Sequence, residues 1–262
     1  MRYEALLRCF AEIASGAPED WDNSGVQIRT DKEEIERVLV CLEVTPAVVE
    51  EAKEQEADLI LSHHPLIFGG VDHLSADDVH EKMLLDLVTA GIDVFSAHIT
   101  FDKAPLGNSF FLADLLGLEE IRPVDTADGG DVLPMVTGDV HPAMNLQELF
   151  LHTADMMDLT RGQIRAAGDP GMTVLKAAVC TGAGSEFMDE AKTAGCQVLI
   201  TGDVKYHEAM RAKELGIGVI DAGHYGTEKY FAENFAAQLR DMAGDELDVL
   251  ESAVNIDPFT FI

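Results

Sequence analysis

Apolar residues in this chain form short runs that alternate with longer amphipathic stretches, a pattern typical of strands alternating with helices. The run at residues 38–41 is followed by Thr45-Pro46, a typical helix start, and by apolar positions spaced as on one helix face. A second apolar run, 58–62, comes next. Strand–helix–strand order predicts neighbouring parallel strands, and therefore an α/β fold.

The same pattern returns 139 residues further along the chain. Residues 177–180 and 198–201 read as strands, with a helix at 187–191 between them. The strands that follow, 91–97 and 217–223, align at an offset of 126. The shorter offset means that the second copy lacks part of the loop around 66–80. We interpret the pattern as an internal repeat that builds two related α/β domains.

The segment between the two copies differs in character and suggests where the domains divide. Residues 125–131 are rich in Asp and Gly, which is typical of a loop or hinge. Further elements are expected as strands at 133–140 and 163–167, helices at 145–158 and 228–242, and a loop or edge strand within 247–262 that closes on the first domain. We therefore expect a first domain at 1–125, completed by 240–262, and a second at 126–239.

Composition excludes several classes of protein. No apolar run approaches the length that spans a bilayer, so we expect no membrane association. A charge inside the apolar start of the chain argues against a secretory signal and favours a cytoplasmic location. The four cysteines show no CxxC spacing, and Cys41 and Cys180, which end similar strands, are expected to be small buried side chains.

The charge balance is strongly acidic. The chain has 18 Lys and Arg against 48 Asp and Glu, a net charge of −30. Such a field repels phosphates, and we find no basic patch, so a nucleic-acid partner is disfavoured. The charge exceeds what a metal site needs, and we interpret it as serving solubility in a high-salt cytoplasm.

Candidate metal ligands lie where the predicted strands end. His98 and Asp102 follow the strand at 91–97, and His224 and Glu228 follow its counterpart. An imidazole and a carboxylate bind divalent metals, but two ligands seldom suffice for a site. The pair His63-His64 follows another strand, and adjacent side chains of an extended segment point to opposite sides, so each histidine can serve a different ion.

Each candidate also has a simpler interpretation. His63-His64 fits a surface loop, Asp102 fits an N-cap for a helix at 106–116, and Glu228 fits the first turn of a helix. Their recurrence at equivalent strand ends favours metal binding over these roles. The role of His98 stays open, because it fits a metal ligand, a residue that orients a ligand, or a proton shuttle.

Other polar residues are harder to assign from sequence. His207 is a candidate proton shuttle or a surface residue, and Asp203 is another group that can move a proton. The loop at 19–25, which holds the only tryptophan, is either a structural turn or part of a pocket. We expect the remaining histidines to face solvent, namely His73, His80, His141 and His152.

Six motifs together resemble the NGG-interacting-factor-like dinuclear metal proteins, also known as GTP cyclohydrolase I type 2 homologues. They lie at residues 21–27, 62–68, 96–102, 179–184, 201–207 and 223–228. The resemblance implies two related α/β domains with a two-metal site in the cleft and ring-like homohexamers. The ligands that it implies are His63, His64, Asp102, His224 and Glu228.

The sequence also departs from the family pattern. Glu43 stands where the family has Asp, and residues 98–102 read His-Ile-Thr-Phe-Asp in place of His-Thr-Asn-Leu-Asp. Residues 69–75 replace a Lys-rich segment, and 129–138 lack the family's glycine-rich form. These changes leave the expected ligands in place but weaken any transfer of a substrate.

Our leading hypothesis is a metal-dependent hydrolase with two divalent ions, Zn, Fe, Mn or Ni, acting on a nucleotide or related small molecule. Paired cations lower the pKa of a water and polarise the bond that it attacks. His98, His207 or Asp203 would move the proton. The resemblance makes GTP a candidate substrate. The alternative is a non-enzymatic metal-binding or scaffold protein that stores, delivers or senses a metal.

Overall fold

The computed structural model describes residues 1–261 and divides into two compact units, each with its own sheet. Unit 1 comprises Met1–Phe101 and Phe231–Pro258, and unit 2 comprises Asp102–Tyr230 with residues 259–261. Both units mix helices with strands, which confirms the predicted α/β class. None of the helices in the described part of the chain has the length and apolar character needed to cross a membrane.

Unit 1 contains a five-stranded sheet in the order β1-β4-β3-β2-β11. Four strands are parallel to their neighbours, and β1 runs antiparallel to β4 at one edge. The last strand, β11, lies beside β2, as expected of an edge strand near the carboxyl end of the chain. The strands are β1 (Gly25–Ile28), β2 (Arg37–Cys41), β3 (Leu59–Ser62), β4 (Asp93–Ser96) and β11 (Asp248–Glu251).

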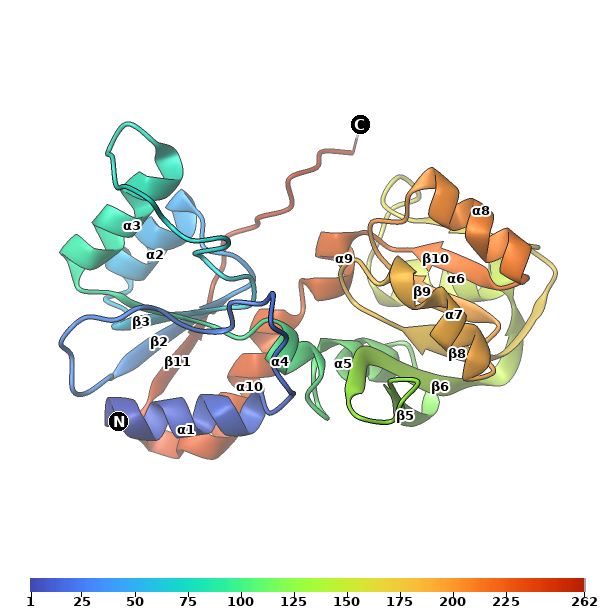
Figure 1. The fold of residues 1–262 in the computed structure, drawn as a ribbon, viewed down its shortest axis with the longest axis horizontal. Coiled ribbons are helices and arrows are strands. Elements are labelled where there is room, and N and C mark those ends of the chain that lie inside the picture. Colours follow the sequence, from blue (N-terminus) through green and yellow to red (C-terminus); the bar gives the residue numbers. More distant parts are fainter. Residues whose placement is uncertain (262) are drawn as a thin grey trace. The chain divides into compact units, whose positions relative to one another are not determined.

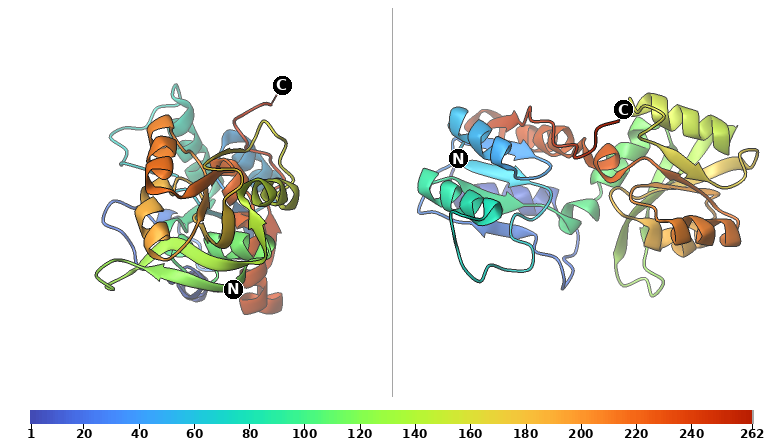
Figure 2. Two further views of the ribbon diagram at one scale, coloured as in Figure 1. Left: turned by 90° about the vertical axis from the view of Figure 1, so that its right-hand side faces the viewer. Right: turned by 90° about the horizontal axis from the view of Figure 1, so that it is seen from above.

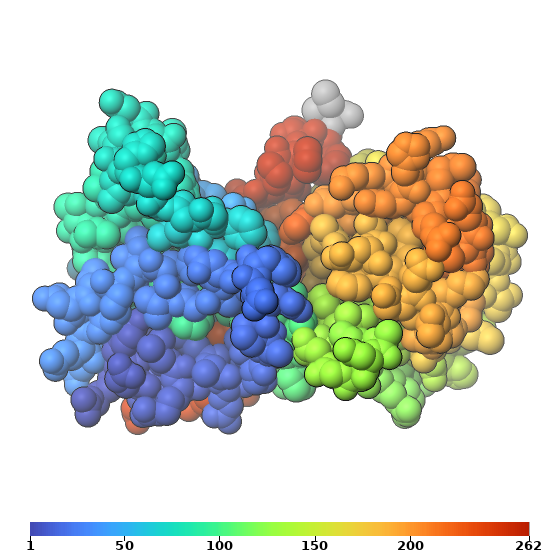
Figure 3. All heavy atoms as spheres, viewed as in Figure 1, coloured from blue at the N-terminus to red at the C-terminus, as the bar shows by residue number. Residues whose placement is uncertain are grey.

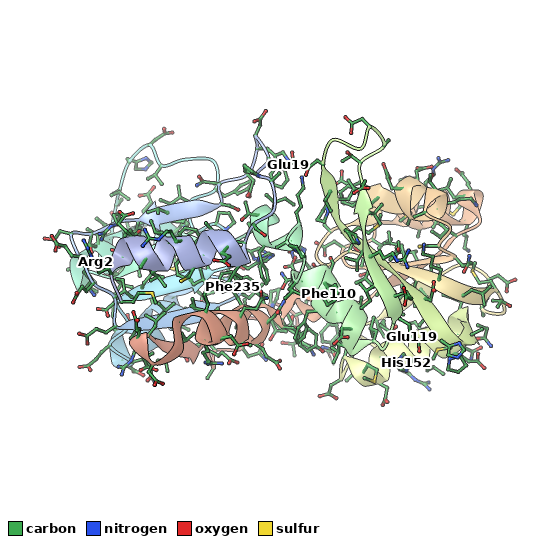
Figure 4. The ribbon with its side chains drawn as sticks, turned by 90° about the horizontal axis from the view of Figure 1, so that it is seen from below. Arg2, Glu19, Phe110, Glu119, His152 and Phe235 are labelled. Atoms are coloured by element: carbon green, nitrogen blue, oxygen red, sulfur yellow. The ribbon has the colours of Figure 1, made fainter. Side chains whose placement is uncertain are left out.

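Helices cover both faces of this sheet, α1 and α10 on one side and α2 and α3 on the other (Figure 1). Phe235 of α10 lies between α1 and α10 (Figure 4), with its ring centroid 6.0 Å from that of Phe10. The predicted helix start is confirmed, because the Thr45 side chain accepts a hydrogen bond from the Val48 N–H. The helices are α1 (Tyr3–Ile13), α2 (Pro46–Glu54), α3 (Val79–Ala90) and α10 (Phe231–Ala243).

Unit 2 contains a six-stranded sheet in the order β5-β6-β8-β9-β10-β7. Its centre, β8-β9-β10, is parallel, and the outer strands pair antiparallel with their neighbours. The strands are β5 (Glu119–Asp125), β6 (Val132–Asn145), β7 (Arg165–Ala167), β8 (Thr173–Val179), β9 (Val198–Thr201) and β10 (Gly218–Asp221).

The helices of unit 2 pack on opposite faces of its sheet, α5 and α6 on one and α7 and α8 on the other (Figure 2). Alternate residues of β8 supply the two cores, since Ala177 and Val179 face α5 and α6 while Ala178 faces α7 and α8. The helices of unit 2 are α5 (Asn108–Leu115), α6 (Leu146–Met156), α7 (Met188–Thr193) and α8 (Tyr206–Leu215), with the short helical turns η1 (Ser185–Phe187) and α9 (His224–Glu228). Two further short turns are η2 (Gly244–Glu246) in unit 1 and α4 (Ile99–Asp102), whose last residue is the first of unit 2.

The compact units divide at residues 101/102 and 230/231, whereas the sequence places the boundaries at 125/126 and 239/240. The helix predicted at 228–242 corresponds to α10, which begins at Phe231, and Glu228 instead ends the separate short helix α9. Side chains of α10 are fully buried against α1 and the first sheet, among them Phe231, Phe235 and Leu239. The segment 125–131, expected to be a loop or hinge, is a loop, the turn that joins β5 to β6 inside unit 2.

Candidate metal centre

In unit 1 three histidines gather beyond the carboxyl ends of β3 and β4. One ring nitrogen from each of His63, His64 and His98 lies within 4.8 Å of the others. His63 and His64 come directly after β3, and His98 follows β4, which is parallel to β3. The sheet therefore brings together the histidine pair and the one histidine whose role the sequence leaves open.

The fold of unit 1 determines which nitrogen of His63 carries a proton. Its Nδ1 lies 2.8 Å from the Ala97 carbonyl oxygen, which can only accept, so Nδ1 donates and Nε2 carries the lone pair. The ring is fully buried and packs against Phe231, with 4.8 Å between ring centroids. This is the tautomer in which Nε2 binds a metal.

Asp22 fixes the tautomer of His98, as the Ala97 carbonyl oxygen does for His63. The Asp22 Oδ1 atom accepts a hydrogen bond from His98 Nδ1 at 2.6 Å, and Ser24 donates to Oδ2 of the same carboxylate. Burial opposes ionisation of Asp22, but the hydrogen bonds from His98 and Ser24 outweigh it and lower the pKa of Asp22 below its usual value. A carboxylate on the far nitrogen is the usual support of a metal-binding histidine.

Sequence reasoning did not find this role for Asp22. The loop at 19–25 stood out by its Asp, Asn and Gly, but a pairing between residues 76 positions apart has no local signal. The Trp21 ring lies edge-on to His98, at 6.1 Å between centroids, and remains 59% exposed. The loop thus reaches the histidine group, which favours the pocket interpretation over a purely structural turn.

Unit 2 presents a second group on α9. His224 Nε2 lies 3.0 Å from Glu228 Oε2, one helical turn away. The Asp203 Oδ2 atom accepts a hydrogen bond from His224 Nδ1 at 2.8 Å. Asp203 has a φ of +54°, a left-handed conformation that Asp tolerates better than most residues. Asp203 is therefore the counterpart in unit 2 of Asp22 in unit 1.

Close glycine contacts hold Glu228 in place. A Cβ atom on Gly182, whose φ is +66°, would lie 2.4 Å from Glu228 Oε1. The Gly182 N–H also donates to Thr227 Oγ1 at 2.9 Å. A Cβ on Gly202 would lie 2.6 Å from the His224 backbone nitrogen. The glycines of the motifs at 179–184 and 201–207 are thus required by the approach of α9.

Asp102 ends α4 and belongs to unit 2. Its Oδ1 accepts a hydrogen bond from Asn108 Nδ2 at 3.1 Å. The alternative role, an N-cap for the following helix, is wrong, because Gly107 is the N-cap of α5. Burial raises the pKa of the Cys180 thiol well above its usual value, and the charges of Asp102 and Glu228 add to the shift. Both carboxylates therefore lie near Cys180, which is buried as predicted.

The other candidates lie apart from these groups. His207 is exposed on α8, with its ring against Tyr206, so the structure does not gather it with the other histidines of unit 2. His73, His80 and His141 are exposed as expected. His152 is the exception, because it is half-buried and its Nε2 lies 2.9 Å from the Leu116 carbonyl oxygen.

The donor atoms of α9 fit a divalent cation. When His224 Nδ1 donates to Asp203, His224 Nε2 carries a lone pair that faces a carboxylate oxygen 3.0 Å away. The lone pairs of this nitrogen and this oxygen repel each other unless a proton or a cation lies between them. At metal–ligand distances of about 2.0–2.2 Å, both atoms can bind one ion.

The fold and these groups define a class of protein, a mixed α/β chain with histidines and carboxylates beyond the ends of parallel strands. The family model for Duf34/NIF3 (NGG1p interacting factor 3) matches residues 1–258, and the chain belongs to this family.

Curated relatives and solved structures agree with this assignment. A protein from Clostridium perfringens named GTP cyclohydrolase 1 type 2 homolog is 28% identical, with full coverage of both chains. One from Helicobacter pylori named GTP cyclohydrolase 1 type 2 is 35% identical, over 82% of this chain and 81% of its own length. The crystal structure of a Bacillus cereus protein related to NIF3 shares the fold, with a TM-score of 0.91 and 21% identity over 100% of this chain and 99% of its own.

Proposed function

We propose that His63, His64, Asp102, His224 and Glu228 bind two divalent ions as one shared dinuclear centre. The support is the division of donors, since unit 1 contributes two of these residues and unit 2 contributes three. Neither set reaches the coordination of two ions by itself. The internal repeat and the location in a cleft between related domains are part of this proposal.

The repeat has topological support. The parallel strands β2-β3-β4 of unit 1 and β8-β9-β10 of unit 2 follow one another in the same spatial order. In both units the third strand also pairs with an antiparallel strand, β1 or β7. His98 with Asp102 and His224 with Glu228 come after these third strands, in the short helical turns of α4 and α9.

We propose that the centre acts as a hydrolase on a nucleotide or related small molecule. Two bound cations would supply an acidified water and polarise the bond under attack. Among this chain's own residues, His98 is the better placed proton shuttle, because Asp22 orients its ring through Nδ1 and the ring lies within the histidine group. His207 is exposed and separate, so a role for it requires the substrate to reach α8.

The metals in this proposal are Zn, Fe, Mn or Ni. The donors are imidazoles and carboxylates, which suit all four, and no thiolate among the proposed ligands singles out zinc. The proposal includes a cytoplasmic location, in keeping with four cysteines that are all free thiols. It also includes assembly as a homohexamer, which the family resemblance implies.

Elemental analysis of protein purified without added metal tests the site. We expect about two equivalents of a divalent ion in the wild type and a marked loss in Glu228→Gln. The exposed Glu233 on α10 offers a matched control, and Glu233→Gln should keep its metal. Equal metal in Glu228→Gln and the wild type would show that the assignment of the ligands is wrong.

A screen of nucleoside triphosphates with the metal-loaded protein tests the reaction. We expect hydrolysis, detected as a changed purine ring or as released phosphate, and its loss in Glu228→Gln. Bound metal without turnover of any nucleotide would support the alternative, a protein that stores, delivers or senses metal.

A further inference from the structure

Helix α5 begins with two polar side chains that are buried inside unit 2. Asn108 is 3% exposed and Ser109 is fully buried, while the residues after them in the helix are mostly apolar. Buried polar groups cost free energy unless they are hydrogen-bonded, so their partners indicate what they do. Those partners lie on the segments that carry or hold the carboxylates of unit 2.

Ser109 fixes the start of the helix. Its hydroxyl donates to the Pro134 carbonyl oxygen at 3.0 Å and accepts from the Thr181 N–H at 3.2 Å. Pro134 belongs to β6, whose hairpin with β5 forms part of the surface of unit 2 (Figure 3). Thr181 begins the loop whose Gly182 approaches the Glu228 carboxylate. The first turn of α5 is therefore anchored on two sides.

Asn108 holds Asp102 from this anchored position. Its Nδ2 atom donates to Asp102 Oδ1 at 3.1 Å. The reverse orientation of the amide is unfavourable, because Asn108 Oδ1 would then face a carboxylate oxygen and neither atom can donate. A hydrogen bond to Oδ1 restricts rotation of the carboxylate and thereby fixes the direction of both its oxygens.

The other end of the amide contributes little to stability. Asn108 Oδ1 is buried, and no residue in the part of the chain that the structure describes donates a hydrogen bond to it. An apolar side chain of similar shape would have no such acceptor to satisfy, so stability is a weak reason for an asparagine at this position. The bond to Asp102 is the stronger reason.

We propose that Asn108 is a positioning residue, which fixes the carboxylate of Asp102 for a divalent cation. Carboxylates that bind metals are usually held by a hydrogen bond from a neighbouring group. A neutral amide suits this task, because it orients the carboxylate without cancelling the negative charge that attracts the cation, as a Lys or Arg would. The inference rests on the proposed function, since it takes Asp102 as a metal ligand.

Zn²⁺ affinity, measured on the full chain by competition with a chelating dye, tests this role. Asn108→Ala removes the amide, and Asn108→Leu replaces it with methyl groups branched at the same carbon, so either variant serves if the other fails to fold. We expect both to bind Zn²⁺ about 10–100-fold more weakly than the wild type. Their metal-free forms should unfold at about the same urea concentration as the metal-free wild type.

Thr153 provides the matched control. It is fully buried on α6 of the same unit, and its Oγ1 has no hydrogen-bond partner among the described residues. Thr153→Val therefore removes a comparable buried oxygen without removing a bond to a proposed ligand. It should bind Zn²⁺ like the wild type.

A double-mutant cycle with Asp102→Ala separates positioning from a merely structural role. If Asn108 acts through Asp102, then Asn108→Ala should lower the affinity further only while Asp102 is present. A structural role would lower it by the same factor in both backgrounds.

The possible results distinguish this inference from the proposed function. If the wild type binds no Zn²⁺, or if Asp102→Ala binds it like the wild type, the assignment of the ligands fails and the inference fails with it. If Asp102→Ala weakens binding but the Asn108 variants bind like the wild type, or if the two substitutions act independently, the inference is wrong and the metal proposal stands.

Discussion

A carboxylate on the Nδ1 atom of a histidine occurs twice in this protein. Asp22 holds His98 and Asp203 holds His224, at 2.6 and 2.8 Å between nitrogen and oxygen. Each carboxylate accepts a hydrogen bond from the Nδ1–H group, which leaves Nε2 as the nitrogen with the lone pair. In both units the same chemistry therefore fixes the tautomer of an imidazole, although the two aspartates come from unrelated places in the sequence.

Replacing the carboxylate of Asp22 should slow the proposed reaction while the metals stay bound. Asp22→Asn keeps the shape of the side chain but removes the charge that fixes the tautomer of His98, the proposed proton shuttle, so we expect turnover to fall about 10–100-fold. Turnover by the metal-loaded variant measures this effect, and elemental analysis checks that its metal content is unchanged. The exposed Asp20, two residues earlier, provides the control, and Asp20→Asn should turn over substrate like the wild type. Equal turnover by the two variants would contradict a supporting role for Asp22.

Asp58 gives unit 1 a stability that depends on pH. Its carboxylate accepts hydrogen bonds from Lys32 Nζ and from the Glu36 and Arg37 N–H groups, at 2.6, 2.8 and 3.1 Å. Burial opposes ionisation, but these bonds outweigh it and lower the pKa of Asp58 below its ordinary value of 3.8. A lowered folded-state pKa stabilises the fold above pH 3.8, and this contribution is lost as the pH falls through the folded-state pKa.

Asp58→Asn should therefore lower the free energy of unfolding at neutral pH by about 1–2 kcal/mol. The difference from the wild type should shrink as the solution is acidified below pH 3.8. Urea denaturation at neutral and acidic pH measures both values. A difference that stays constant with pH would show that the charge of Asp58 is not the cause.

The short helix α9 depends on the loop that follows β8. Gly182 lies in the left-handed region and touches the Glu228 carboxylate, so the loop and the helix approach more closely than any other residue at that position allows. Gly202, after β9, plays the same part for the start of α9. Two strand-end loops thus determine where the carboxylate of α9 lies.

A comparison of Gly182→Ala with Gly195→Ala separates the effect of backbone strain from the effect of the contact with Glu228. The new Cβ would lie 2.4 Å from Glu228 Oε1, so we expect Glu228 to shift and metal affinity to fall about tenfold. Gly195 also has a positive φ, +85°, but a Cβ there meets nothing within 4 Å. Gly195→Ala should lose a similar stability, about 1 kcal/mol, and keep its metal affinity. Isothermal titration with the metal and thermal unfolding measure the two effects, and loss of metal affinity in both variants would contradict the contact argument.

The net charge of −30 acts on the whole molecule. Carboxylates at this density repel one another in the folded state, and dissolved salt screens that repulsion. The ion pairs of the described residues neutralise only part of the acidic side chains, because the chain has 18 basic residues for 48 acidic ones. Stability should therefore depend on ionic strength.

We expect the melting temperature to rise as sodium chloride increases from about 0.1 to about 1 M, where the screening length falls from about 10 to about 3 Å. Thermal unfolding followed by circular dichroism measures it, with sorbitol as an uncharged control solute. A melting temperature that does not respond to salt would contradict the interpretation that the acidity suits a high-salt cytoplasm.

Local signals account for what could be predicted. The apolar runs at 38–41, 59–62 and 198–201 are strands because every side chain of such a run is buried between two helical layers. The histidines lie at strand ends because they follow those runs directly in the sequence. The boundary between the two units was harder to predict from the sequence, because the amphipathic pattern of α10 shows that one face is buried but not which sheet buries it.

By itself, then, the sequence determined the α/β class, the parallel strands β2, β3, β4, β8, β9 and β10, and the positions of His63, His64, His98 and His224 beyond strand ends, because these depend on periodicity and on neighbours in the chain. Only the tertiary structure decided that α10 joins the first sheet and that Asp22 and Asp203 hold the two imidazoles. Those outcomes depend on the order of strands in each sheet, which brings together side chains that no local pattern connects.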